Sequence, residues 1–160
     1  MLSVCPLNQN AQPILTPPID TTGPSHATSA IFIIYDIFGF SDQALQGADI
    51  LAHADAKSGH EYQVFMPDFF LGKPLTHNDY PPDTEEKKKT VGAFFGGPAA
   101  PPDNAKKVPG LMKEIEKQCS GIQKWGSLGM CWGGKVGHPM NDAVKVCAGM
   151  WAYSHDRSSL

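Results

Sequence analysis

The segment Gly129-Met130-Cys131-Trp132-Gly133 follows an apolar run and constrains the fold more than any other part of the chain. Small residues two positions before and two positions after a cysteine are typical of a sharp strand-to-helix turn, where larger side chains would collide. Such a turn raises the thiol above the end of a sheet, where it can act as a nucleophile, and the backbone N–H of Trp132 would point into the same space. The alternative interpretation is an inert, buried cysteine beside a glycine-rich turn.

The apolar runs before this turn predict an α/β fold. Residues 30–35 form a continuous apolar and β-branched run, which is typical of a strand covered on both faces. A helix predicted over residues 42–56 and a strand over 62–66 complete a βαβ unit, and hence a parallel sheet. Further strands are predicted at 122–128 and 144–150. Helices are expected at 84–95 and 103–118, with Pro109 trimming or kinking the first turn of the second helix.

The chain divides by composition into a short lead-in and one domain. Residues 1–29 contain five prolines among many Ser, Thr and Asn residues, so they predict a loop with at most a weak edge strand near Ile14. Residues 30–160 form the predicted domain. With 160 residues, of which 41% are hydrophobic, the chain is long enough for one core of ordinary size.

Charge and motif patterns exclude several classes of function. A net charge of −3 and a pI near 6.0 give no electrostatic footprint for nucleic acid or an anionic membrane. Residues 129–136 come close to a phosphate-binding loop, but Val136 stands where that loop needs a hydroxyl group to ligate Mg²⁺. The four cysteines form no C-x-x-C pair and have no histidine at zinc-finger spacing, so neither a structural metal nor a redox dithiol is suggested. No cofactor is expected. Without a signal-peptide pattern or a long apolar segment, the sequence predicts a cytoplasmic protein.

Three separated stretches together resemble the dienelactone hydrolase family of α/β-hydrolases, particularly its fungal members. The resemblance covers roughly residues 30–135, and these stretches are Tyr35-Asp36-Ile37-Phe38-Gly39-Phe40, Met66-Pro67-Asp68-Phe69-Phe70 with Gly72-Lys73-Pro74, and Gly129-Met130-Cys131-Trp132-Gly133-Gly134-Lys135. The resemblance implies that Cys131 is the nucleophile, that Asp36 contacts the resting nucleophile, and that the backbones of Ile37 and Trp132 form an oxyanion hole.

Two acidic residues at the ends of predicted strands have structural alternatives. Asp36 follows a buried strand at the end where ligands of α/β sheets bind, but an aspartate in a turn also accepts hydrogen bonds from the local backbone. Asp68 is interpreted as structural, because Met-Pro-Asp is expected to fix the turn after the second strand.

The remaining catalytic residues of this family have no match in the chain. In the α/β-hydrolase fold the acid and the histidine of the triad follow the nucleophile, and only 29 residues follow Cys131 here. We therefore expect a partial α/β-hydrolase fold, with a mostly parallel sheet flanked by helices, that ends early and lacks the last strands. His155 is a candidate substitute base after the fourth predicted strand, although an exposed histidine in a polar tail is the simpler interpretation.

Two functions of different class remain open. The first is a dienelactone hydrolase-like enzyme, in which Cys131 attacks a small-molecule ester or lactone and water then releases the acid. The second is a catalytically impaired, truncated domain that binds a small molecule or is silent. The strands that are expected to be missing would also leave a sheet edge exposed, which predicts self-association.

Overall fold

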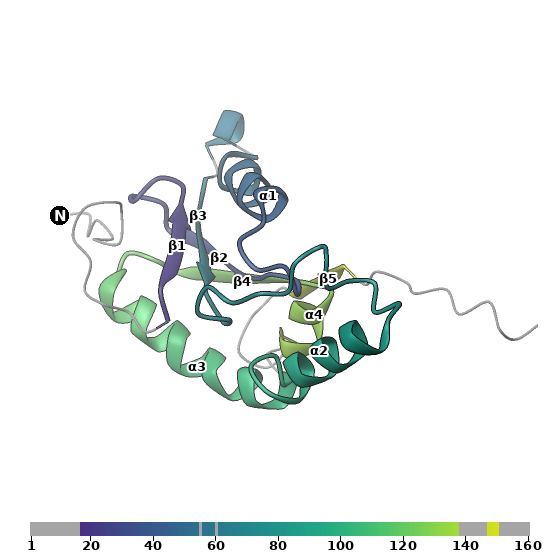
Figure 1. Ribbon diagram of the computed structural model, residues 1–160. Helices are drawn as coiled ribbons and strands as arrows, with labels where there is room; N and C mark the ends of the chain where they lie inside the picture. The colour runs from purple at the N-terminus through teal and green to yellow at the C-terminus, as the bar shows by residue number, and fades with distance from the viewer. Residues whose placement is uncertain (1–16, 55, 60, 138–146, 151–160) are drawn as a thin grey trace, which may run out of the picture.

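The computed structural model describes residues 17–54, 56–59, 61–137 and 147–150 of the chain. They form one five-stranded sheet with α1 on one face and α3 on the other (Figure 1). The strands are β1 (Ile19–Thr22), β2 (Ser29–Ile34), β3 (Tyr62–Pro67), β4 (Lys124–Met130) and β5 (Cys147–Met150). The helices are α1 (Asp42–His53), α2 (Glu85–Gly96), α3 (Pro101–Gln118) and α4 (Trp132–Gly137), with a short 3₁₀ turn at Ala56–Ser58.

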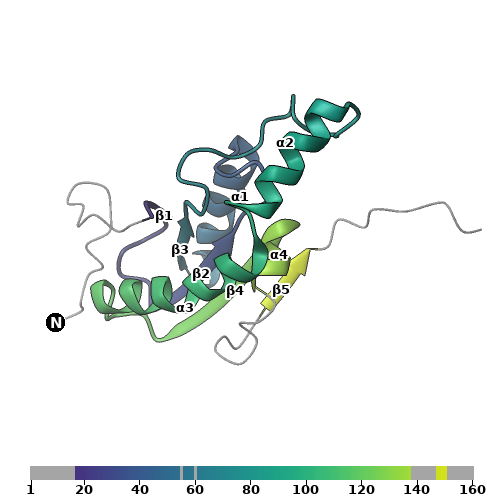
Figure 2. The same cartoon turned by 60° about the horizontal axis from the view of Figure 1, so that its bottom comes forward.

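The sheet is mostly parallel, as the βαβ pattern predicts. Its strand order is β1-β3-β2-β4-β5, and β2 pairs in parallel with both β3 and β4, while β5 pairs in parallel with β4. Figure 2, which turns α3 toward the viewer, shows β5 beside β4. After β2, the chain forms β3 on one side of β2 and later forms β4 on the other side of β2. The carboxyl ends of β2 and β4 therefore lie at a topological switch point, where open α/β sheets bind their ligands.

The prediction of a loop over residues 1–29 was wrong for the part that contains residues 19–22. Residues 19–22, which we expected in a loop, form β1 and pair antiparallel with β3, so that Ile19 lies opposite Pro67. An antiparallel strand at the edge of a sheet can have few apolar residues, because it is less covered by neighbouring elements than a central strand. The weak strand expected near Ile14 lies outside the described residues.

Helix α3 also differs from its prediction. It begins at Pro101 rather than at Asp103, because proline suits the first turn of a helix, where its missing N–H has no partner to lose. Pro109 lies inside the helix and does not end it, since α3 continues to Gln118.

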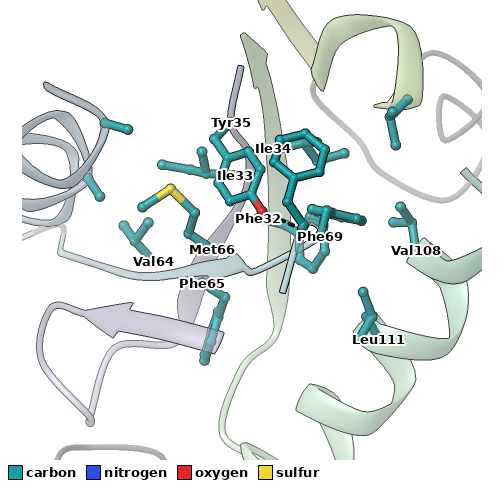
Figure 3. Close-up of a cluster of buried hydrophobic side chains, with 14 of the residues drawn as sticks. Phe32, Ile33, Ile34, Tyr35, Val64, Phe65, Met66, Phe69, Val108 and Leu111 are labelled. Atoms are coloured by element: carbon teal, nitrogen blue, oxygen red, sulfur yellow. Dashed lines mark hydrogen bonds between the residues drawn. The ribbon is translucent and has the colours of Figure 1, made fainter. Parts of the chain in front are cut away.

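The core fills both faces of the sheet around β2 and β3. On one face, α1 presents the small residues Ala44, Ala48 and Ala52, which allow the helix to approach closely. On the other face, Val108 and Leu111 of α3 point toward the cluster that contains Phe32 and Phe69 (Figure 3). These residues are buried, so the two helices hold the central strands in place.

A buried hydrogen-bond network joins the carboxyl ends of β2 and β3. The Tyr35 hydroxyl donates to Asp68 Oδ1 at 2.9 Å and accepts from the backbone N–H of Phe70 at 3.0 Å. Asp68 Oδ2 accepts from the N–H of Gly72 at 2.7 Å, which confirms the structural role predicted for this aspartate. Burial, together with Asp68, raises the pKa of Tyr35, so the hydroxyl remains protonated.

We expect Tyr35→Phe to lower the free energy of unfolding by about 1–2 kcal/mol, because it removes a buried hydroxyl that serves two partners. Tyr80→Phe is the matched control, since Tyr80 is 46% exposed and should lose almost nothing. Urea denaturation of both variants measures the difference. Equal stabilities would contradict a contribution from this network.

Candidate active site

The Cys131 turn has the backbone conformation that the sequence predicts. Strand β4 ends at Met130 and α4 begins at Trp132, so Cys131 alone makes the connection. Its φ angle is +51°, in the left-handed region that residues with side chains rarely adopt. Strain of this kind is concentrated at functional sites and persists only where the surrounding structure enforces it. The thiol is free and exposed, which excludes the interpretation as a buried cysteine.

Two glycines make this turn possible because α4 lies directly against the strands. A Cβ atom on Gly129 would lie 2.6 Å from the carbonyl oxygen of Gly133. A Cβ atom on Gly133 would lie 2.0 Å from the carbonyl oxygen of Ile34, the last residue of β2. Both distances are too short for a real carbon atom, so the steric reason predicted for the glycine spacing is confirmed at both positions.

Asp36 and Cys131 follow the carboxyl ends of two neighbouring parallel strands, and so lie at the same end of the sheet. Ile34 of β2 is paired with Gly129 of β4, and each of the two candidate residues lies two positions beyond this pair. Asp36 is partly buried, and its Oδ1 accepts the N–H of Phe38 at 2.8 Å. The turn-forming role is therefore present, and it holds the carboxylate in the loop that follows β2.

The two predicted oxyanion donors belong to well-anchored residues. Ile37 is buried, and its carbonyl oxygen accepts the N–H of Leu75 at 3.0 Å, which ties the loop after β2 to the segment after β3. Trp132 is 2% exposed, and its Nε1 donates to the carbonyl oxygen of Ala99 at 2.8 Å. The ring of Trp132 packs 4.6 Å from that of Phe70, between centroids. Rigid anchoring of this kind suits a preorganised oxyanion hole.

The histidines of the described residues lie in two places. His26 and His53 each lie 3.6 Å from a carboxylate oxygen of Glu61, next to the start of β3 and therefore at the opposite end of the sheet from Cys131. His77 lies in the segment after β3, with its ring 4.4 Å from that of Phe38. The candidate base His155 lies outside the described residues.

Sequence reasoning did not single out His77, although this histidine lies beside the loop that carries Asp36 and Ile37. The sequence predicts a loop at His77, which lies 39 positions after Phe38, so no local pattern joins the two rings. The hydrogen bond from the N–H of Leu75 to the carbonyl oxygen of Ile37 and the packing of Pro74 on Gly39 join the two segments.

A cavity of about 570 Å³ lies away from the candidate site. Its walls include Ser29 and Lys124, the first residues of β2 and β4, together with the apolar side chains of Ile31, Leu51 and Leu128. The cavity therefore lies toward the amino ends of the strands, whereas Cys131 and Asp36 follow their carboxyl ends. It contributes nothing to the chemistry of the thiol.

Three further observations concern cofactors, cysteines and membranes. Within the described ranges, no group of three or more His, Cys, Asp and Glu side chains is arranged to hold a metal ion. Cys119 is buried and disulfide-bonded, a covalent bond that the cysteine spacing did not predict. None of the helices described in the structure is both long and apolar enough to cross a membrane.

Comparison with known proteins shows distant homology to AIM2 family and carboxymethylenebutenolidase (dienelactone hydrolase) proteins. An uncharacterized AIM2 family protein of Schizosaccharomyces pombe is 33% identical over 114 residues, which are 71% of this chain and 43% of that protein. The carboxymethylenebutenolidase homolog of Rattus norvegicus is 31% identical over 140 residues, covering 87% of this chain and 52% of the relative. Hydrolase pyvD of Aspergillus violaceofuscus is 32% identical over 107 residues, which are 67% of this chain and 38% of that protein.

The chain spans about half the length of the curated relatives it matches. No family model matches it. The resemblance found in the three sequence stretches is confirmed as homology, and it agrees with the mostly parallel sheet flanked by helices.

We expect Gly133→Ala to lower the free energy of unfolding by roughly 3 kcal/mol or more, because the new methyl group would collide with the backbone of β2. Gly134→Ala is a matched control one residue away, where the nearest atom to a new Cβ lies at 3.7 Å. That variant should be unchanged or more stable by up to about 1 kcal/mol, since alanine favours helix. Chemical denaturation compares them, and similar stabilities would contradict the close packing of α4.

Proposed function

We propose that this chain, a distant homologue of the dienelactone hydrolases, hydrolyses small-molecule esters or lactones with Cys131 as the nucleophile. The left-handed conformation of Cys131, exposed between a strand end and a helix start, is the observation that carries the proposal. Relatives named hydrolase and carboxymethylenebutenolidase homolog support the reaction class.

In the proposed first half-reaction, the Cys131 sulfur attacks the carbonyl carbon, and the carbonyl electron pair moves onto oxygen. The backbone N–H groups of Ile37 and Trp132 donate to this oxyanion. Collapse of the tetrahedral intermediate breaks the ester C–O bond, the alcohol leaves with the proton that the Cys131 thiol has given up, and a thioester remains on Cys131. For a lactone, the alcohol stays attached to the acyl group. Asp36 positions the resting thiol from the neighbouring loop.

In the second half-reaction, water attacks the thioester carbon, the C–S bond breaks, and the acid leaves while the thiol regains its proton. This step needs a base to activate the water, and general-base assistance typically contributes about 10²–10⁴ in rate. His26 and His53 pair with Glu61 at the opposite end of the sheet, so neither suits this role. Of the histidines in the described residues, His77 alone lies beside the loop that carries Asp36. A slow release of the acyl group would support the second candidate function, an impaired domain that binds a substrate and turns it over poorly.

Acylation should be faster than turnover in the chain as it stands. With 4-nitrophenyl acetate we expect a burst of about one equivalent of nitrophenolate, followed by slow turnover, and one acetyl group on Cys131 by peptide mass mapping. Cys131→Ala, or prior alkylation of the thiol by iodoacetamide, should abolish both phases.

Two outcomes would change this interpretation. A burst that survives in Cys131→Ala would exclude the proposed nucleophile. Fast multiple turnover that is lost in His155→Ala would show that the tail supplies the base, and would exclude the impaired-domain alternative.

We further propose that the chain self-associates through β5, which is the outermost strand of the described sheet beside β4. Sedimentation velocity over a range of concentrations should show dimers or larger species that increase with concentration. Ile50→Lys alters an exposed apolar residue on α1 and should leave the association unchanged. A monomer at every concentration would contradict the proposal.

A further inference from the structure

The cavity at the amino ends of β2 and β4 has one face of the sheet as its floor. In the parallel register of these strands, Ser29 is paired with Lys124 and Ile31 with Gly126. Because side chains alternate along a strand, these positions share one face of the sheet, together with Leu128. The opposite face carries the side chains that pack on α3 (Figure 3). All of these floor residues line the cavity, whose volume is about 570 Å³.

The floor is apolar but incompletely covered, because α1, the helix on this face, packs mainly on β3. Ile31 belongs to the central strand β2, and yet it is only partly buried, as are Leu51 of α1 and Leu128. In contrast, Ile33, two positions further along β2, is 1% exposed. A cavity with apolar walls and a volume within roughly 300–1,000 Å³ is typical of a small-molecule site.

Gly126 leaves bare backbone in the middle of this floor. A Cβ atom there would meet nothing nearer than the carbonyl oxygen of Ala30, at 3.9 Å. Gly129 on the same strand differs, because a Cβ atom there would collide with α4. No close contact in the described structure therefore requires glycine at position 126. Glycine inside a strand weakens it, and it often marks a place where a ligand approaches the backbone closely.

Lys124 supplies an uncommitted positive charge at the mouth of the cavity. Its side chain is exposed and forms no ion pair with any residue that the structure describes. Its backbone is fixed, because the carbonyl oxygen of Thr28 accepts the N–H of Gln123 at 2.7 Å and that of Lys124 at 3.2 Å. The carboxylate of Glu61, also at the mouth, lies 3.6 Å from Nε2 of His26. The ammonium group is therefore the charge left for a ligand, and its natural partner is a carboxylate.

We propose that this cavity binds an amphipathic monocarboxylate, a small acid with an apolar body. The body lies against Ile31, Leu51 and Leu128 and over the bare backbone of Gly126, and the carboxylate pairs with Lys124. The site is at the opposite end of the sheet from the Cys131 turn. The proposal therefore does not depend on the proposed hydrolysis.

The test compares decanoate with decylamine, which have the same alkyl chain and opposite charges at neutral pH. Calorimetric titration is done below the critical micelle concentration of either compound. We expect decanoate to bind several-fold more tightly than decylamine, which is the preference that one partly exposed ion pair provides.

Substitutions in the cavity separate the contribution of shape from that of charge. Gly126→Val fills the floor and should weaken the binding of both compounds at least tenfold, while the fold is kept, since valine favours strands. Lys124→Glu should reverse the preference, and Lys124→Arg should keep it. Lys113→Gln, which removes an exposed positive charge from α3 on the other face of the sheet, is the matched control and should change neither affinity.

Three outcomes would overturn the proposal. Decanoate that binds to Gly126→Val as tightly as to the parent chain would occupy another place. A parent chain that binds neither compound, or a Lys124→Glu variant that still prefers decanoate, would exclude the proposed ligand class. Sedimentation velocity adds a third outcome, because an oligomer that dissociates in Gly126→Val would show that a second copy of the chain fills the cavity. Circular dichroism verifies the fold, and the exposed Lys124 variants keep the test decisive if Gly126→Val does not fold.

Discussion

At Gly133, helix α4 packs against the end of β2 with no side-chain carbon between the two backbones, and the candidate site depends on this contact. A Cβ atom at Gly133 would lie 2.0 Å from the carbonyl oxygen of Ile34, so the helix could not approach if any other residue stood there. With the helix this close, one residue must reverse the chain between β4 and α4. Cys131 therefore takes a left-handed conformation, which turns its thiol outward at the switch point of the sheet.

The three sequence stretches that carry the family resemblance meet in one aromatic cluster beneath this turn. Tyr35, Phe70 and Trp132 come one from each stretch, and their rings lie within 4.6–6.4 Å of one another, between centroids. The same residues make the buried hydrogen bonds to Asp68 and to the carbonyl oxygen of Ala99. Each stretch therefore supplies one ring to the aromatic cluster that packs together beside the Cys131 turn.

The sequence predicts those parts of the structure that depend on local pattern. The continuous run in residues 30–35, the glycine spacing around Cys131 and the strand ends at Asp36 and Asp68 each follow from neighbouring residues, and the structure agrees with them. Strand β1 was not predicted because its hydrogen-bonding partner is β3. That strand begins at Tyr62, 40 positions after Thr22, the last residue of β1. The contact between the rings of Phe38 and His77 was not predicted for the same reason, because the two residues come from segments that are far apart in the sequence.

The placement of the residues also divides the proposed reaction into two parts with different requirements. Acylation needs a nucleophile and oxyanion donors, and on the proposed function Cys131, Ile37 and Trp132 supply these just beyond the carboxyl ends of β2 and β4. Deacylation needs a base that can reach a water molecule beside Cys131. That requirement makes the burst, rather than the steady-state rate, the direct measure of what this arrangement of strands and loops can do.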